Sequence, residues 1–186
     1  MTLWKVFDAA FPPATAPPGA QAVLGYIGRP GFTPHVWTVG EWDRFAHLRQ
    51  FPAAVPDFAN DPKVEAAWFA DAMKALGWEA HAVPARVLLV DEETRSQDAA
   101  WYQMFAAELV DVGFVSVEYG SLSTVLANSA YDVWAADWDG IPELVPGQVM
   151  QGKQYKAGVP WQGTVIDLSV VDDWLWERAG RGARHG

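Results

Sequence analysis

Residues 86–90 read Arg86-Val87-Leu88-Leu89-Val90, a nearly continuous apolar run that leads into the acidic triplet Asp91-Glu92-Glu93. Such a run is typical of a parallel strand that is buried on both faces. Helical patterns flank it. Asp61-Pro62 offers an N-cap with proline at the first helical position, and a second helix is expected from Ser96 to Gly113. Alternating helices and buried strands predict an α/β domain.

The same alternation continues on both sides of this run. Residues 12–19 are rich in proline and predict a loop, because proline removes hydrogen-bond donors. Further strands are expected at residues 3–7, 22–27, 51–55 and 114–118, with a capping box at Thr38 that begins a helix to about residue 49. After residue 120 the helices shorten, and strand-like runs are expected at residues 131–136, 148–151 and 164–168.

Two architectures fit this pattern, an open doubly wound sheet and a β/α barrel. Both place ligand sites at the carboxyl ends of their strands. Polar residues follow six of the expected strands, namely Asp8, Asp57, Asp91, Tyr119, Asp137 and Asp167. Six such positions are more typical of a ring around a barrel mouth. We therefore predict a modified TIM-type barrel over residues 1–178, followed by a flexible basic tail at residues 179–186.

Composition restricts the function classes. The chain has 186 residues, a net charge of −10 and no cysteine, which argues against nucleic-acid binding and excludes disulfides and thiolate metal sites. No apolar run approaches the roughly 20 residues of a membrane span, and no signal peptide is expected at the N-terminus. Neither the histidine spacing nor the glycine spacing fits a metal or nucleotide site, so no metal and no cofactor are predicted.

The acidic triplet provides the sharpest chemical signal. In an extended strand Asp91 and Glu93 share one side, about 6.6 Å apart along the chain. Two carboxylates in a partly dry cleft do not ionise together easily, so one pKa rises. A proton donor beside a charged partner is what glycoside hydrolysis requires. The alternative is that the triplet only ends a strand and caps the next helix.

The triplet also resembles the Asp-x-Glu motif that ends the fourth barrel strand in lysozymes of glycoside hydrolase family 25. Further resemblances follow in family order, at Asp8, residues 132–137, Gln154-Tyr155 and residues 165–169. The family fold has five β/α units followed by three strands with little helix. The opening strand lacks the usual Gly-x-Asp-x-Ser motif, and Ser169 stands where asparagine is commoner. These departures make the chain more similar to a divergent group from actinobacteria and their phages.

This resemblance implies a peptidoglycan hydrolase that cleaves the β-1,4 bond after N-acetylmuramic acid. Glu93 would be the general acid and base, and Asp91 would orient the substrate's own acetamido group in retaining, substrate-assisted chemistry. Asp8 and Asp167 would complete an acidic floor. The expected substrate-binding residues are Tyr119, Asp137, Trp138, Gln154 and Tyr155, with Tyr119 and Trp138 as candidates for stacking on sugars.

A second function remains open at this point. The barrel could be catalytically silent and act as a carbohydrate-binding or phage tail protein. Because no signal peptide is expected, we predict synthesis in the cytoplasm and action at the cell wall, either after release or within a phage particle. Virion or tail proteins would be partners in the latter case.

Overall fold

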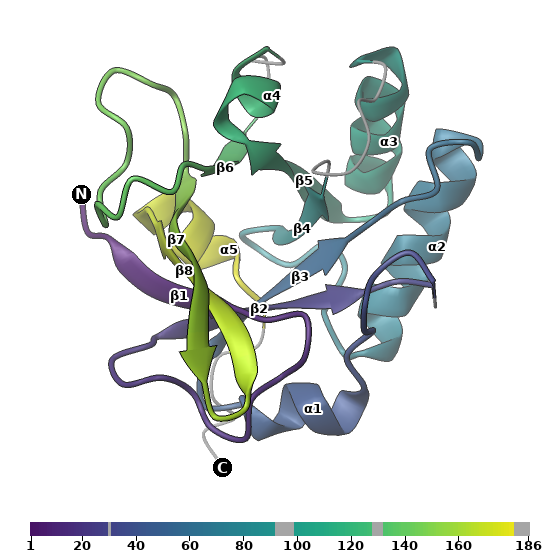
Figure 1. The fold of residues 1–186 in the computed structure, drawn as a ribbon. Helices are drawn as coiled ribbons and strands as arrows, with labels where there is room; N and C mark the ends of the chain where they lie inside the picture. Colours follow the sequence, from purple (N-terminus) through teal and green to yellow (C-terminus); the bar gives the residue numbers. More distant parts are fainter. Residues whose placement is uncertain (30, 92–98, 128–131, 181–186) are drawn as a thin grey trace.

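The chain folds into a closed eight-stranded barrel, seen in a computed structural model that describes residues 1–29, 31–91, 99–127 and 132–180 (Figure 1). The strands are β1 (Trp4–Asp8), β2 (Ala22–Ile27), β3 (Arg49–Ala54), β4 (Arg86–Asp91), β5 (Phe114–Ser121), β6 (Val133–Ala136), β7 (Gly152–Trp161) and β8 (Thr164–Val171). The helices are α1 (Val39–Arg44), α2 (Pro62–Ala75), α3 (Ala99–Asp111), α4 (Leu122–Ala127) and α5 (Asp173–Arg178). The predicted modified barrel with little helix in its last third is confirmed.

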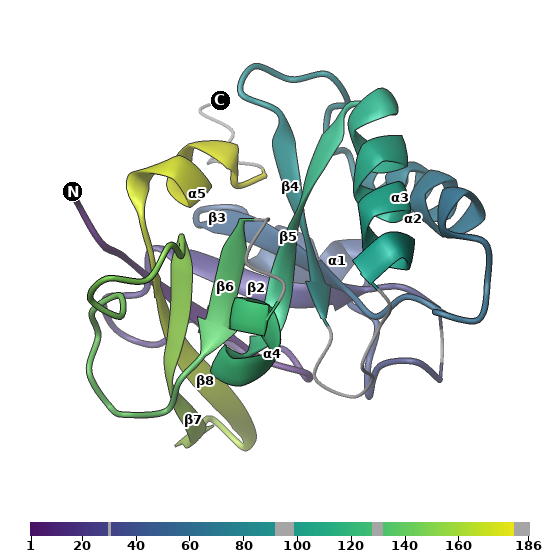
Figure 2. The same cartoon turned by 90° about the horizontal axis from the view of Figure 1, so that it is seen from above.

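Strand direction departs from an all-parallel barrel at one place. Strands β1 to β7 pair in parallel in chain order, whereas β8 is antiparallel to both β7 and β1. The β1–β8 register sets Asp8 directly opposite Asp167. The carboxyl ends of the parallel strands define one end of the barrel, called the mouth below. In Figure 2 the arrowheads of β5 and β6 point towards this end and away from α5.

The barrel interior is apolar and is closed at the end opposite the mouth. The apolar side chains of the interior come from every strand except β7, namely Val6, Ala22, Leu24, Phe51, Ala53, Val87, Leu89, Val117, Tyr119, Trp134 and Val171. Leu175 of α5 and Ala179 join this cluster. Asp172 caps α5 by accepting a hydrogen bond from the Leu175 amide at 2.9 Å. This α5 side of the barrel is called the closed end.

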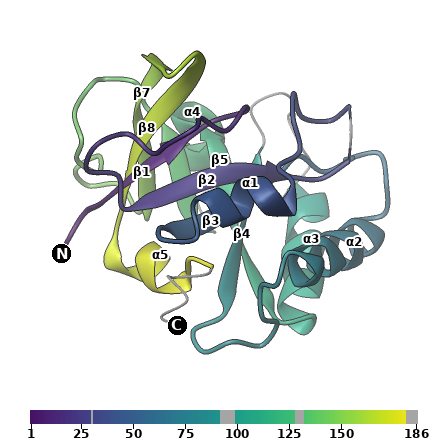
Figure 3. The ribbon, with the colours of Figure 1, turned by 90° about the horizontal axis from the view of Figure 1, so that it is seen from below.

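Helices cover only part of the outside. Phe69 of α2 and Phe105 of α3 belong to one large core between the helices and the outer faces of β1 to β5. All three views show α2 and α3 side by side, and Figure 3 shows α1 against β2 and β3. The predicted capping box at Thr38 is present. No helix among the described residues is long and apolar enough to cross a membrane.

Two expected elements differ from the structure. Helix α1 ends at Arg44 rather than near residue 49, because residues from Arg49 onward pair with β2 and cannot keep helical hydrogen bonds. The strand expected at residues 148–151 is absent; those residues have no regular secondary structure, and β7 begins at Gly152. Val149 and Met150 looked strand-like, but Val149 is exposed and Met150 packs outside β6. The Ser96 cap lies outside the described residues.

The C-terminal boundary differs slightly from the sequence reading. Ala179 is buried, and Gly180 forms an isolated bridge with Gln50, so both residues belong to the barrel domain. A basic tail at residues 181–186 stays a prediction, since those residues lie outside the described part.

Candidate active site

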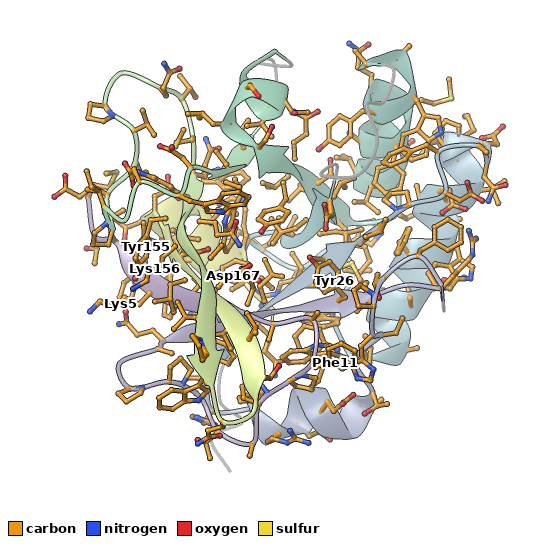
Figure 4. All side chains as sticks on the ribbon, in the orientation of Figure 1. Lys5, Phe11, Tyr26, Tyr155, Lys156 and Asp167 are labelled. Carbon is orange, nitrogen blue, oxygen red and sulfur yellow. The ribbon has the colours of Figure 1, made fainter. Side chains whose placement is uncertain are left out.

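The mouth carries buried carboxylates where the strand pattern places them. Asp8 ends β1 and Asp91 ends β4, and their exposed fractions are only 5% and 6%. Each follows an apolar strand, so its backbone is fixed by the sheet ladder while its side chain reaches the rim. Figure 4 shows Asp167 from β8 between Tyr26 of β2 and the Tyr155–Lys156 segment of β7. Three carboxylates therefore lie at the mouth of the barrel.

Asp91 is held by a tyrosine that sequence reasoning did not single out. The Tyr26 hydroxyl donates a hydrogen bond of 3.1 Å to Asp91 Oδ2. Tyr26 lies two residues after Leu24 on β2, so both side chains face the interior, with Tyr26 nearer the mouth. A tyrosine at the end of an otherwise apolar strand was the available signal. The bond fixes the orientation of the carboxylate.

Asp8 and Asp167 meet through Gln154. Like charges placed directly opposite each other in an antiparallel pair are destabilising. The Gln154 amide nitrogen donates to Asp167 Oδ2 at 2.8 Å and lies 3.4 Å from Asp8 Oδ2. Gln154 is itself buried, with 2% of its surface exposed. The amide therefore joins two carboxylates that would otherwise repel each other.

Asp167 also accepts a backbone hydrogen bond that depends on a glycine. Gly158 lies where β7 departs from regular register, and its φ of +72° is in the region that favours glycine. Its amide donates to Asp167 Oδ1 at 2.6 Å. Burial raises the pKa of Asp167, while the bonds from Gly158 and Gln154 oppose that rise. The site thus holds a carboxyl that takes up a proton more readily than an exposed aspartate.

Trp138 sets the orientation of Gln154. Its indole Nε1–H donates to Gln154 Oε1 at 2.7 Å, which leaves the Gln154 amide nitrogen to face the two carboxylates. The Trp138 side chain itself is 65% exposed. An exposed aromatic ring whose edge is fixed beside buried carboxylates is a suitable platform for a sugar face.

The other predicted site residues have different surroundings. Tyr119 is 2% exposed and packs edge-on against Trp134, so its ring faces are closed to a sugar and the predicted stacking has no support. Asp137 pairs with Lys153 at 3.4 Å. Tyr155 lies in the irregular part of β7 and lines grooves outside the barrel rather than the mouth. Asp57 accepts from the Ala59 amide in a local turn.

Glu93 lies outside the described residues, as do all of residues 92–98. The predicted Asp91–Glu93 arrangement therefore stays a prediction. The described part of the mouth provides ionisable oxygen atoms, an amide and an exposed indole. Within that part of the chain, no group of three or more histidine, cysteine, aspartate or glutamate side chains is arranged to hold a metal.

Solved structures of low sequence identity share this fold. A B. stearothermophilus protein described as uncharacterized has a TM-score of 0.74 and 16% identity, covering 95% of this chain and 99% of its own. The catalytic domain of endolysin ply40 from a bacteriophage of Listeria monocytogenes has a TM-score of 0.67 and 15% identity, covering 95% and 97%. A muramidase from Acremonium alcalophilum has a TM-score of 0.61 and 16% identity, covering 88% and 92%.

No protein-family model and no curated protein sequence matches the chain. At identities this low, the structural likeness establishes a common fold, shared with an endolysin catalytic domain and a muramidase.

Proposed function

We propose that the protein is a peptidoglycan hydrolase, an N-acetylmuramidase of the family 25 type. The observation that carries the proposal is the set of carboxylates at the mouth of the barrel: Asp8 and Asp91, both buried, and the half-buried Asp167. Burying a carboxylate costs free energy that hydrogen bonds only partly restore. The presence of buried carboxylates at the end of the barrel where ligands bind therefore favours a catalytic role. The fold shared with an endolysin catalytic domain and a muramidase supports the same reading.

The proposed reaction is substrate-assisted and retains the anomeric configuration. Asp91, oriented by the Tyr26 hydroxyl, accepts a hydrogen bond from the N–H of the substrate's acetamido group. The acetamido oxygen then attacks the anomeric carbon as the glycosidic bond breaks. Glu93, assigned from the sequence, gives its proton to the leaving oxygen and afterwards removes one from the attacking water. Ionised Asp91 stabilises the positive charge that develops on the acetamido group.

The second group of residues binds the sugar. Asp8 and Asp167 accept hydrogen bonds from sugar hydroxyls, and Gln154 keeps the two carboxylates together. Trp138 offers its exposed ring to a sugar face. In this proposal the protein acts on bacterial cell-wall glycan, after release in the manner of an endolysin or as part of a phage particle.

Fragment analysis tests the proposal. The protein is incubated with peptidoglycan from several wall types, and soluble products are identified by mass spectrometry. We expect new reducing-end muramic acid from the wild type and none from Asp91→Asn or Glu93→Gln. The matched control is Asp71→Asn. Asp71 lies on α2, outside the strands that form the mouth, and its side chain is 80% exposed. This control should release fragments at the wild-type rate.

Two results would overturn the assignment. Fragments with a different reducing sugar would show another bond specificity. No release from any wall type, together with retained glycan binding, would instead support a silent barrel that serves in carbohydrate binding or phage assembly.

A further inference from the structure

A groove lies on the outer side of Trp138, next to the mouth. Its volume is about 440 Å³, and it is lined by Trp138, Asp139, Gly140, Tyr155, Lys156 and Ala157. We call it the Trp138 groove. Figure 4 shows two of these residues, Tyr155 and Lys156, on β7 to one side of Asp167. Because Trp138 also contacts Gln154 inside the mouth, one indole separates the proposed reaction site from this groove.

The walls of the groove are fixed before any ligand binds. The Gly140 amide donates to the Tyr155 carbonyl oxygen at 2.9 Å, which ties the loop after β6 to β7. Lys153, only 1% exposed, reaches from β7 to Asp139 Oδ2 at 2.7 Å and to Asp137 Oδ2 at 3.4 Å. A preformed wall loses little conformational freedom on binding, which favours affinity.

Charge in the groove favours an anion. Both oxygens of Asp139 accept hydrogen bonds: Oδ2 from Lys153, which also pairs with Asp137, and Oδ1 from the Ile141 amide at 2.8 Å. The hydrogen bond from Lys153 holds the pKa of Asp139 below its ordinary value. Lys156, in contrast, is exposed and forms no ion pair with any residue in the described part of the chain. An uncompensated ammonium beside an aromatic platform, in a chain of net charge −10, fits a carboxylate on a sugar.

We infer that the Trp138 groove binds a carboxylate-bearing sugar of the glycan strand, with the sugar ring on Trp138 and its carboxylate paired with Lys156. This inference rests on the proposed function and adds a source of substrate selection to it. Muramic acid differs from N-acetylglucosamine by a lactyl ether that carries a carboxylate. This carboxylate is free wherever no stem peptide is amide-linked to it, so Lys156 makes the groove selective for peptide-free stretches of wall glycan over a neutral chain of N-acetylglucosamine.

Two tetrasaccharides that differ in the lactyl carboxylates test whether the groove recognises this negative charge. One alternates N-acetylglucosamine with N-acetylmuramic acid whose lactyl carboxylates are free, and the other contains N-acetylglucosamine alone. Both are titrated by calorimetry into the full chain carrying Asp91→Asn, so that turnover does not consume the ligand. Lys156→Met and Lys156→Glu are compared in that background. The matched control is Lys74→Met on α2, another exposed lysine that is far along the chain from Lys156.

We expect the Asp91→Asn protein to bind the anionic tetrasaccharide more tightly than the neutral one. Lys156→Met should weaken anionic binding about three- to fivefold, as expected for an exposed ion pair, with neutral binding unchanged. Lys156→Glu should weaken anionic binding further. Raising the salt concentration should reduce the preference in the Asp91→Asn protein and in its Lys74→Met form, but not in Lys156→Met. Equal effects of the Lys156 substitutions on both ligands, or no effect on either, would overturn the inference.

The two proposals fail in different ways. If wall fragments form and depend on Asp91, but binding shows no Lys156-dependent preference, the hydrolase proposal stands and the proposal for the Trp138 groove is wrong. A Lys156-dependent preference without any fragment release would leave an anionic glycan site on a silent barrel.

Discussion

At its closed end the barrel interior is completed by Leu175 and Ala179, whereas at the mouth the same interior leads to Asp8, Asp91 and Gln154. Both sets of side chains are buried. The first set gains free energy by leaving water, at about 25 cal/mol per Å² of apolar surface. The second set gives up hydration that hydrogen bonds only partly restore.

Aromatic side chains also differ in use between the two ends. Trp4 and Trp176 stack at the closed end with ring centroids 4.2 Å apart, and Arg49 lies over Trp176. At the mouth, Trp138 is 65% exposed and its indole N–H donates a hydrogen bond to Gln154. A barrel selected only for stability could close both ends with apolar contacts. The contrast therefore assigns apolar stabilisation to the closed end and the proposed function to the mouth.

The largest expected effect is loss of activity at the mouth without loss of stability. Asp91→Asn removes the charge proposed to stabilise the acetamido group and should lower kcat/KM on the order of 10²–10³-fold, or about 3–4 kcal/mol. Urea unfolding should show a free energy equal to or above that of the wild type, because a buried charge has gone. A parallel fall in stability and activity would erase the distinction between the two ends.

The converse change at the closed end should affect stability alone. Leu175→Ala removes a fully buried side chain and should lower the free energy of unfolding by about 3 kcal/mol. Activity per folded molecule, measured well below the new Tm, should stay near the wild-type value. An activity loss in the fully folded variant would show that the two ends are coupled.

Elements whose burial follows from their own sequence pattern could be predicted from the sequence. The run at residues 86–90 identifies β4, and Asp91 follows it at the mouth, because a strand buried on both faces has a clear apolar signature. Strand β7 was not found, because Lys153, Gln154 and Tyr155 interrupt any alternating pattern. Its polar side chains are buried only because the mouth and the loop after β6 supply partners far along the chain.

The position of Asp8 opposite Asp167 depends on the direction of β8. Asp8 and Asp167 were both expected at strand ends, but Asp167 lies inside β8, and its direct opposition to Asp8 requires β8 to be antiparallel. One local signal was available: Gln162-Gly163 joins paired Trp161 and Thr164, with positive φ at both positions, as in a tight two-residue hairpin. The Tyr26–Asp91 bond could not be predicted in this way, since it spans 65 positions and needs the closed barrel.

A matched pair of tryptophan substitutions gives a smaller effect. Trp138→Phe keeps an aromatic platform but removes the N–H that orients Gln154, so kcat/KM should fall about fivefold, the value of a hydrogen bond of about 1 kcal/mol. Trp174→Phe makes the same chemical change near the closed end, where the ring lies under Arg178. That variant should keep wild-type kcat/KM. Equal losses in both would mean that aromatic packing, not the bond to Gln154, is responsible.

The smallest expected effect is a difference in pH dependence between one aspartate at each end. Burial raises the pKa of Asp167 at the mouth, whereas hydrogen bonds from the Thr2 amide and the Trp4 indole lower the pKa of Asp173 at the closed end. A raised folded-state pKa means that Asp167 stabilises the fold below its ordinary pKa of about 3.9, and that this contribution is lost as pH rises through the higher folded value. Asp173 has the opposite sign: its contribution is present above the ordinary pKa and is lost as pH falls through the lower folded value.

Urea unfolding between about pH 3 and pH 6, on either side of the ordinary pKa, measures both signs. The stability of the wild type minus that of Asp167→Asn should decrease as pH rises, and the wild type minus Asp173→Asn should increase. Taking differences removes the contributions of carboxylates that do not interact with the substituted residue; the contribution of Asp8, which shares Gln154 with Asp167, remains part of the Asp167 difference. If both differences moved in the same direction, burial would not outweigh the hydrogen bonds from Gly158 and Gln154 in raising the pKa of Asp167, and the electrostatic contrast between the two ends would fail.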